Sequence, residues 1–259
     1  MNREAEEYST ASHAARADRP FGDIPHEELL LEREHYDIRL VSTSRQRIKT
    51  GIFIERMYSC RGYHTDICAL LQNRANQLTL EASDPCRILG TLTLGMDSES
   101  GLLADELYGR EINFFRRQNR KVCELSRLAM DLEHGSKEML ASLFHLAYIL
   151  GRNINKATDL FIEVNPRHAG FYRRMLGLRQ IGEERTCRRV QAPAVLMHLE
   201  LDYVDEKIAQ LAGLAELCDQ GERSLYPYFF SKREEEKAAS KVSGYLSRIM
   251  SGTPAVLSD

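Results

Sequence analysis

The chain has 259 residues, enough to bury one substantial core and to carry a further helical segment. Its apolar content of 43% and its 28% of charged residues are ordinary for a globular protein, and the net charge of −3 argues against a generally basic nucleic-acid-binding surface. No apolar run approaches the roughly 20 residues of a membrane helix, so we predict no transmembrane segment.

Cysteine and histidine usage points away from metal binding and from disulfides. The six cysteines and eight histidines are scattered, without a Cys-x-x-Cys motif or the spacing of a metal site. The first residues also lack the apolar stretch of a signal peptide. We therefore predict reduced thiols, a cytoplasmic location and no bound metal.

The N-terminal residues are polar, and hydrophobic periodicity begins only after them. We predict a mobile arm over residues 1–34, with a short helix at 27–34. Strict alternation at 36–41 predicts a first strand. Ser42 or Ser44 can cap the helix that follows. Its inward side chains are predicted to be Ile48, Ile52, Phe53 and Met57.

Two antiparallel strands are predicted next, at 77–82 and 87–94, joined by the turn Ser83-Asp84-Pro85. A loop with two glycines then leads to a helix near 103–118. The inward side chains of that helix are predicted to be Leu103, Leu107, Ile112 and Phe115.

A central strand is predicted at 121–131, apolar on both faces except at Glu124, Ser126 and Arg127. Burying an acid and a base in a strand is costly unless they are paired or used. The helix after Gly135-Ser136 presents one apolar face, formed by Leu140, Leu143, Phe144, Ala147 and Leu150. Charged residues on a strand that feeds a helix mark the place where open α/β sheets build sites, so we predict the chemistry here.

The segment 159–177 combines a buried strand with a complete helix signature. Asn165 can cap the helix, Pro166 suits its first position, and Gly177 suits the left-handed residue that ends it. A further strand is predicted at 194–201, followed by helices at 203–220 and 232–250. The order of strands and helices predicts a mixed α/β (α+β) fold with a mostly antiparallel sheet flanked by helices.

Several segments carry a resemblance to known acyltransferases. Cys123–Met130 resembles the Glu-x-Ser-Arg-Phe segment of acyl-homoserine-lactone synthases, and Val164–Leu178 resembles the Asn…Tyr…Leu-Gly-Phe helix of GNAT enzymes. Thr93 stands where the lactone synthases carry an arginine, which disfavours that family. The chain is most similar to the long-chain N-acyl amino acid synthases, and Met57–Tyr63, Gly90–Gly95 and Leu102–Tyr108 also support this resemblance.

The resemblance implies a GNAT-like acyltransferase domain over 35–205 and leaves 206–259 as a helical C-terminal extension. It also implies transfer of a fatty acyl chain from the phosphopantetheine thioester of acyl carrier protein to an amino acid, with no bound cofactor. Enzymes of this fold that use coenzyme A usually bind its diphosphate on a Gly-rich loop. Here that place is 130–137, with a single glycine and the repelling side chains Asp131 and Glu133, which favours the carrier protein as donor.

The resemblance also assigns roles to residues. Glu124 would be the base, Arg127 would hold that glutamate or a substrate carboxylate, and Tyr172 would be an acid near the departing thiolate. Backbone amides of the central strand would face the thioester oxygen. The substrate-binding residues would be Ser126, Leu128, Asn165, Arg61 and Tyr63.

Acyl carrier proteins are acidic, so the enzyme should offer cations near the entry of the pantetheine arm. The candidates on and after the Asn165 helix are Arg167, Arg173, Arg174 and Arg179. A solvated charged face explains such a cluster equally simply.

Other roles for these residues remain open from the sequence. In a regular strand Arg127 lies on the face opposite Glu124; a bulge would bring the two closer. Without a bulge, Glu124 is a buried member of an ion pair with another arginine. Tyr172 can be a core tyrosine, and Asn165 can serve as a cap alone.

Two other functions fit the same pattern. One is a GNAT enzyme that moves a short acyl group from coenzyme A to a small amine or a protein. The other is a non-catalytic protein that binds acyl chains or acyl carrier protein.

Overall fold

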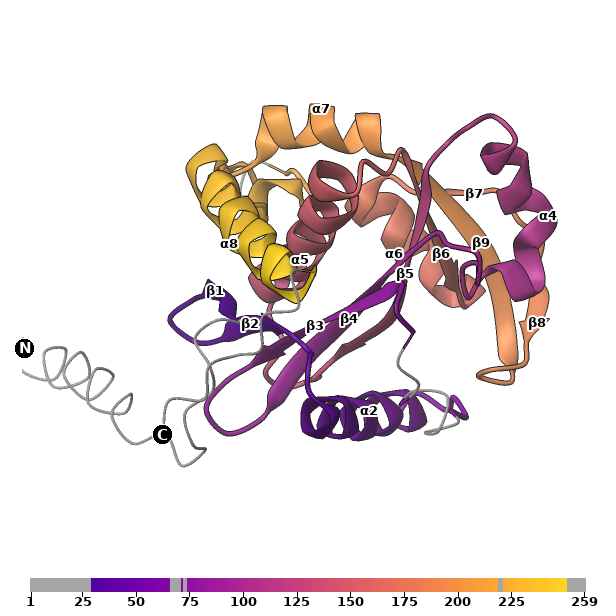
Figure 1. Ribbon diagram of the computed structural model, residues 1–259, viewed down its shortest axis with the longest axis horizontal. Helices are drawn as coiled ribbons and strands as arrows, with labels where there is room; N and C mark the ends of the chain where they lie inside the picture. Colours follow the sequence, from indigo (N-terminus) through magenta and orange to yellow (C-terminus); the bar gives the residue numbers. More distant parts are fainter. Residues whose placement is uncertain (1–28, 66–70, 72–73, 219–220, 251–259) are drawn as a thin grey trace, which may run out of the picture.

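The structure, a computed structural model, describes residues 29–65, 71, 74–218 and 221–250 (Figure 1). In this part of the chain the strands form one nine-stranded sheet in the order β1-β2-β3-β4-β5-β6-β9-β7, with β8 paired to β9. Only β5 and β6 run parallel; the other pairs are antiparallel. The strands are β1 (Leu29–Glu32), β2 (Asp37–Leu40), β3 (Gln77–Ser83), β4 (Ile88–Met96), β5 (Val122–Met130), β6 (Asp159–Val164), β7 (Arg179–Gln180), β8 (Arg185–Cys187) and β9 (Ala192–Glu200).

Helices cover both faces of the sheet. In Figure 1, α2 lies below the sheet and α5, α7 and α8 lie above it. The helices are α2 (Ser44–Ser59), α4 (Asp105–Arg116), α5 (Lys137–Tyr148), α6 (Pro166–Leu176), α7 (Leu201–Leu211) and α8 (Lys232–Met250). Short helical turns are η2 (Ile149–Ile154, a π-helix), η3 (Ala215–Cys218) and η4 (Tyr226–Tyr228). No helix in the described ranges is long and apolar enough to cross a bilayer.

The elements with the clearest sequence signals are confirmed. The antiparallel pair β3–β4 and the central strand β5 lie where periodicity placed them. The side chain of Asn165 caps α6 by accepting a hydrogen bond from the Arg167 amide at 3.2 Å. Gly177 ends that helix with a φ of 85°, the left-handed conformation that glycine adopts at least cost.

Two expectations near the N-terminus are wrong. The short helix at 27–34 is replaced by β1, because Leu29 and Leu31 pair with β2 and extend the sheet by one edge strand. Residues 29–34 of the predicted arm therefore belong to the ordered fold, and residues 1–28 lie outside the described part. On α2, Ile48 and Ile52 are each 50% exposed, and the buried face is formed by Thr50, Gly51, Phe53, Ile54 and Met57.

The cap of α2 also differs from expectation. Thr43, between the two predicted serines, forms a capping box with Gln46, in which each side chain binds the backbone amide of the other residue. Apolar residues occur all round this helix, so periodicity could not choose the buried side. On the buried side, Thr50 donates a hydrogen bond to Glu81 of β3 at 2.7 Å.

The C-terminal part is helical through residue 250, and α8 lies where it was predicted. The helix predicted at 203–220 begins at Leu201 and ends at Leu211, before the turn η3. The short strands β7 and β8 were not predicted; two- and three-residue strands are too short to show an alternation. Residues 219–220 and 251–259 lie outside the described part.

Candidate active site

The sheet opens in its middle, where β5 and β6 part. Their parallel pairing ends at Leu125 and Ile162, although β5 continues to Met130 and β6 to Val164. Beyond that point the backbone of Ser126–Leu128 has no paired residue on β6 and borders the gap between the two strands. A backbone edge at the mouth of a gap can donate hydrogen bonds to a ligand.

A bulge lies in β5 at the same point. Thr93 pairs with Ser126 and Thr91 pairs with Ala129, so β5 holds one residue more than β4 between these pairs. Arg127 has a φ of 52°, in the left-handed region, and its carbonyl accepts a hydrogen bond from Thr91 Oγ1 at 3.0 Å. Bulges re-aim side chains next to active sites.

Glu124 is 3% exposed and is held by backbone amides. Its Oε1 accepts from the Leu103 amide at 2.7 Å, and its Oε2 accepts from the Ala104 amide at 3.0 Å. Burial raises the pKa of Glu124, and these two hydrogen bonds oppose the rise. The loop before α4 therefore fixes the carboxylate of Glu124.

Arg127 is half-buried beside Tyr58 at the end of α2. Burial lowers the pKa of its guanidinium, while Tyr58 and Glu124 act in the opposite direction. Three parts of the chain therefore meet at the bulge: the strand itself, the C-terminal end of α2, and the loop before α4.

Three tyrosines gather at the opening. The rings of Tyr58 and Tyr63 lie 5.9 Å apart in an edge-to-face arrangement. Burial raises the pKa of Tyr58 to about 12, with Arg127 acting against the rise. Burial also raises the pKa of Tyr172, and Tyr58 and Tyr63 add to the effect, so the hydroxyls of Tyr58 and Tyr172 are protonated at neutral pH.

Two buried polar atoms at this place have no hydrogen-bond partner among the described residues: the hydroxyls of Tyr63 and Ser126. Such groups are rare in folded proteins and often await a ligand or a water molecule. Both residues were predicted to bind substrate.

Two arginines, Arg61 and Arg167, hold the loop that follows α2. Arg61 donates to the carbonyls of Met57 at 2.8 Å and Met130 at 3.3 Å, and so ties α2 to the end of β5. Arg167 donates to the Arg61 carbonyl at 3.1 Å, and its guanidinium lies 4.8 Å from the centre of the Tyr63 ring. Arg167 thus supports the loop that follows α2.

Asn165 uses both ends of its amide within the fold. Besides capping α6, it donates from Nδ2 to the Pro193 carbonyl at 3.1 Å and joins α6 to β9. A contact between Asn165 and pantetheine would use the remaining hydrogen-bonding capacity of this side chain.

The sequence did not reveal the network beside Glu124. Arg189 donates to Glu163 at 2.7 Å, to Glu106 at 2.6 Å and to the Leu103 carbonyl at 2.9 Å. It therefore braces the loop that holds Glu124. These residues come from three distant segments, so no local spacing could have linked them.

The outward-facing arginines differ in their partners. Arg179 donates to Glu200 at 2.8 Å. Arg173 and Arg174, in the last turn of α6, are exposed and form no ion pair within the described residues.

In the turn between β5 and α5, the carboxylate of Asp131 accepts hydrogen bonds from the backbone of the turn itself. Asp131 Oδ1 accepts from the amides of Glu133 at 3.0 Å and His134 at 2.9 Å, and it contacts His134 Nδ1 at 3.0 Å. Partial burial acts against ionisation, but the hydrogen bonds from His134 and the backbone prevail, so the pKa of Asp131 is lowered. The Asp131 carboxylate thus occupies these two backbone amides of the turn. The described residues contain no cluster of three or more His, Cys, Asp or Glu side chains that could hold a metal ion.

Comparison with known proteins identifies the family of this chain. Residues 49–200 match the model of the family described as "N-acyl amino acid synthase FeeM". The chain belongs to this N-acyl amino acid synthase family. It is also similar to the structure of FeeM, an N-acyl amino acid synthase from uncultured soil microbes, with a TM-score of 0.58 and 26% identity over 64% of this chain and 90% of that one.

A second similar structure is an acyl-CoA N-acyltransferase from Pseudomonas aeruginosa, with a TM-score of 0.47 and 11% identity over 63% of this chain and 98% of that one. A search of curated proteins found no match. The open, mostly antiparallel sheet flanked by helices has the GNAT arrangement predicted from the sequence. The protein is an acyltransferase of this family, and an amino acid is its acceptor.

Proposed function

We propose that the protein moves a long-chain acyl group from the phosphopantetheine thioester of acyl carrier protein to the amino group of an amino acid. The observation that carries this proposal is the gap between β5 and β6, with the bulge at Arg127 on its edge. Around the gap lie two unpartnered hydroxyls, a buried carboxylate and protonated tyrosines, which are the groups that acyl transfer to an amine requires.

In the proposed reaction the amine nitrogen attacks the thioester carbon, and a C–N bond forms. The carbonyl oxygen becomes an oxyanion, which backbone amides of the segment Ser126–Leu128, at the edge of the gap, stabilise. Collapse of this intermediate breaks the C–S bond and releases the pantetheine thiolate.

Three proton transfers accompany the proposed step. Glu124, whose pKa is raised by burial, receives the ammonium proton through a water molecule, because its oxygens are enclosed by the amides of Leu103 and Ala104. Tyr172, whose raised pKa keeps it protonated, donates to the thiolate, and the second proton that the nitrogen loses on becoming an amide returns to the Tyr172 oxygen. Arg127 binds the carboxylate of the acceptor amino acid.

The turn after β5 supports a carrier protein as donor. Coenzyme A would bring a diphosphate to this turn, where Asp131 already takes the amides of Glu133 and His134. A second anion there would meet the Asp131 charge and find fewer donors. Phosphopantetheine on a carrier protein carries one phosphodiester and leaves the remaining recognition to the protein surface.

The experiment is a competition between donors. The protein is incubated with a pool of amino acids and either long-chain acyl carrier protein or the matching acyl-coenzyme A, and products are identified by mass spectrometry. We expect an N-acyl amino acid from the carrier protein and far less from coenzyme A. Equal or better use of coenzyme A would overturn the choice of donor, and products of short chains alone would overturn the long-chain assignment.

A further inference from the structure

Glu124 and Arg189 make hydrogen bonds to the same peptide group, from opposite sides. Arg189 donates to the Leu103 carbonyl at 2.9 Å, and the Ala104 amide donates to Glu124 Oε2 at 3.0 Å. The Leu103 carbonyl and the Ala104 N–H belong to one planar peptide group, in which they point in opposite directions. The path from the guanidinium to the carboxylate therefore consists of two hydrogen bonds and the peptide group between them.

We propose that Arg189 is a positioning residue for Glu124: acting through the peptide group 103–104, it holds this carboxylate in the ionised form that accepts a proton. The inference rests on the proposed function, in which Glu124 is the base. Arg189 acts on the base and not on the reacting atoms.

A cation that binds a peptide carbonyl polarises the whole peptide group. Negative charge is drawn toward the oxygen, the N–H becomes a stronger donor, and successive hydrogen bonds strengthen one another. A stronger donor stabilises the charged form of the carboxylate that it binds. The Glu106 amide reaches the Leu103 carbonyl only at 3.4 Å, so Arg189 is the main donor to this carbonyl among the described residues.

The guanidinium of Arg189 is itself fixed by two carboxylates. It donates to Glu163 on β6 at 2.7 Å and to Glu106 on α4 at 2.6 Å, and 29% of the Arg189 side chain is exposed. Together with the Leu103 carbonyl, these acceptors take hydrogen bonds from both terminal nitrogens of the guanidinium. A planar fork of donors suits several acceptors at fixed positions better than the single nitrogen of a lysine does.

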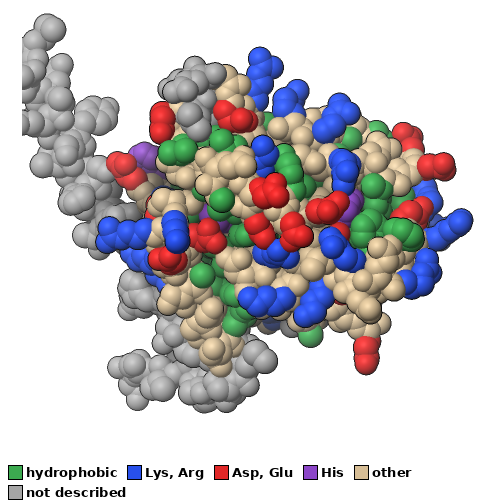
Figure 2. Space-filling view, turned by 90° about the horizontal axis from the view of Figure 1, so that it is seen from above, with side chains coloured by type: hydrophobic (Ala, Val, Ile, Leu, Met, Phe, Trp, Pro, Cys, Tyr) green, Lys and Arg blue, Asp and Glu red, His purple; other side chains and the backbone are tan. Residues whose placement is uncertain are grey.

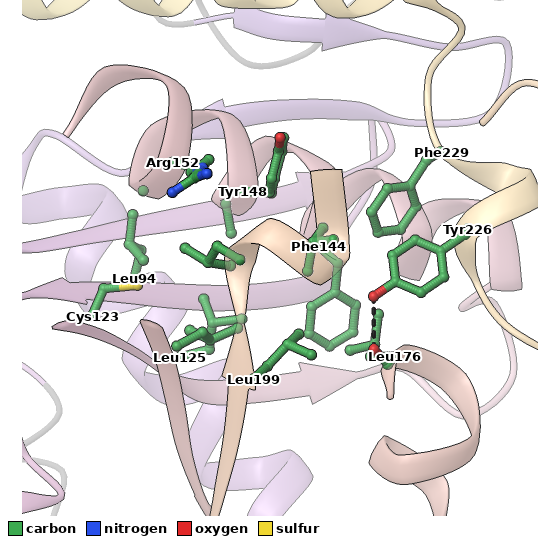
Figure 3. A pocket seen from close by; sticks show the side chains of 15 residues that line it. Leu94, Cys123, Leu125, Phe144, Tyr148, Arg152, Leu176, Leu199, Tyr226 and Phe229 are labelled. Carbon is green, nitrogen blue, oxygen red and sulfur yellow. Dashed lines mark hydrogen bonds between the residues drawn. The ribbon is translucent and has the colours of Figure 1, made fainter. Parts of the chain in front are cut away.

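The remaining surroundings of Glu124 give its carboxylate little support. On β4, a Cβ at Gly95 would lie 2.9 Å from Glu124 Oε1, so this side is closed by backbone. The neighbours Cys123 and Leu125 point to the opposite face of β5, where they line an apolar cavity of about 30 Å³ beside Gly151 (Figure 3). An apolar surface offers a carboxylate no hydrogen bond, so the ionised form depends on the amides of the loop before α4 and on nearby charges.

The charges near Glu124 partly oppose one another. Burial has the largest effect and raises the pKa of Glu124, whereas the two loop amides and the charge of Arg189 lower it and the charge of Glu163 raises it. On β5 itself, Glu124 also interacts with Arg127 and with the thiol of Cys123, whose pKa is raised by burial. Because Glu163 opposes the direct effect of the Arg189 charge, the path through the peptide group can be tested by removing both charges together.

The first test is the pH–rate profile of Arg189→Met, a variant that keeps an unbranched side chain and removes its charge and donors. The rate should still rise with pH through the ionisation of Glu124, but at a pH about one unit higher than in wild type. Below this rise the rate should be about tenfold lower, and at high pH the two rates should converge. KM for the acceptor amino acid should stay near the wild-type value. A loosened loop would instead lower the rate at every pH, and that result would contradict the inference.

A second variant removes the charge that Arg189→Met leaves behind. The Glu163 side chain is 10% exposed, and without Arg189 it is a buried carboxylate that can destabilise the fold and add its own effect on Glu124. Arg189→Met combined with Glu163→Gln removes both charges, so the loss of the peptide path should still move the profile upward, by a smaller amount. Arg189→Lys, which restores a cation, should move it less than Arg189→Met. A double variant with the wild-type profile would rule out the path through the peptide group.

Arg185→Met is the matched control. Arg185 also donates to a glutamate of α4, Glu111, at 2.5 Å, and to a backbone carbonyl of α4, that of Leu107. The N–H of that peptide group, on Tyr108, donates to the Ala104 carbonyl at 2.8 Å and not to Glu124. The profile of Arg185→Met should therefore match wild type. An equal shift would assign the effect to the loss of any arginine beside α4 and would overturn the inference.

Carbon-13 NMR of protein labelled at its glutamate carboxyls separates this inference from the proposed function. The Glu124 signal is the one missing in Glu124→Gln, and its titration reports ionisation without any reaction. If wild-type protein makes no product but Glu124 titrates about one unit higher in Arg189→Met, the role of Arg189 stands and the proposed reaction fails. If product forms and neither the profile nor the titration moves, the reaction stands and Arg189 is a structural residue alone. Thermal melting of each variant confirms that it is folded before the comparison.

Discussion

At the scale of single residues, Glu124 is the group with the most unusual environment. A carboxylate that is 3% exposed in the middle of a sheet pays a large desolvation penalty. The amides of Leu103 and Ala104 offset part of this cost, and the pKa is still raised by burial. The same environment suits a structural acceptor and a base, and these two roles can be separated by experiment.

We predict that Glu124→Gln lowers kcat by about 10²-fold or more, because general bases contribute 10²–10⁴-fold. In wild-type protein the rate should rise with pH through the raised pKa of Glu124, since only the ionised form accepts a proton, and the variant should lose this limb. The pH–rate profiles of both proteins are the measurement.

The matched control is Glu81→Gln. Glu81 is also a buried carboxylate with a pKa raised by burial, but it lies on β3 and binds Thr50. If both variants lose stability alike and keep the wild-type pH profile, Glu124 is a structural residue and not the base.

At the scale of elements, α5 and the C-terminal segment are joined through one buried imidazole. His145 Nδ1 accepts from the Phe230 amide at 2.8 Å, and its Nε2 lies 3.5 Å from Glu235 of α8. The ring stacks between Phe229 at 4.7 Å and Phe230 at 4.5 Å. Protonation of the imidazole places a hydrogen on Nδ1. That hydrogen would point at the hydrogen of the Phe230 amide, so the hydrogen bond between them would be lost.

We predict that the protein loses stability as pH falls below 6.5. Burial lowers the pKa of His145 from 6.5 in the folded state, although Glu235 and Glu234 oppose this, so the unfolded state binds the proton first. The loss should approach about 1.4 kcal/mol per pH unit between 6.5 and the lowered folded-state value. Denaturant melts over this range measure the effect.

A variant isolates the contribution of this histidine. His145→Asn keeps an acceptor that can face the Phe230 amide but cannot be protonated, so its stability should vary less with pH. His35→Asn, at an exposed position, should behave like wild type. An undiminished slope in His145→Asn would assign the acid sensitivity to other groups.

At the scale of the whole molecule, charge is mixed on the face formed by α7 and α8. Seen from above, basic and acidic side chains alternate over this surface (Figure 2). A net charge of −3 gives no general attraction to an acidic carrier protein, so a docking site must be local. The exposed pair Arg173 and Arg174, at the end of the helix that carries Tyr172, offers such a site.

We predict that Arg173→Glu combined with Arg174→Glu raises KM for acyl carrier protein by about tenfold and leaves kcat nearly unchanged. The reason is that the charges act on the partner and not on the reacting atoms. KM for a free acyl-pantetheine thioester should stay at the wild-type value. Arg110→Glu combined with Arg117→Glu, at exposed positions on α4 and at its C-terminal cap, makes the same change in net charge and is the control; an equal effect there would mean that net charge and not a docking site is responsible.

The sequence determined the elements and the family. Periodicity located the strands β3, β4 and β5, and the signature from Asn165 to Gly177 defined α6, because capping and alternation are local properties of the chain. The motifs around Glu124 and Asn165 led to the N-acyl amino acid synthases and to the GNAT fold.

Only the tertiary structure decided how the site is built. The bulge at Arg127 follows from the registration of β5 against β4, and the partners of Glu124 come from a loop 20 residues away along the chain. The meeting of Tyr58, Tyr63 and Tyr172, and the closing of the cavity near Gly151 by Tyr226 and Phe229, depend on packing between distant segments. Such contacts carry no local sequence signal, because side chains of many kinds can face one another once the backbone has brought them together.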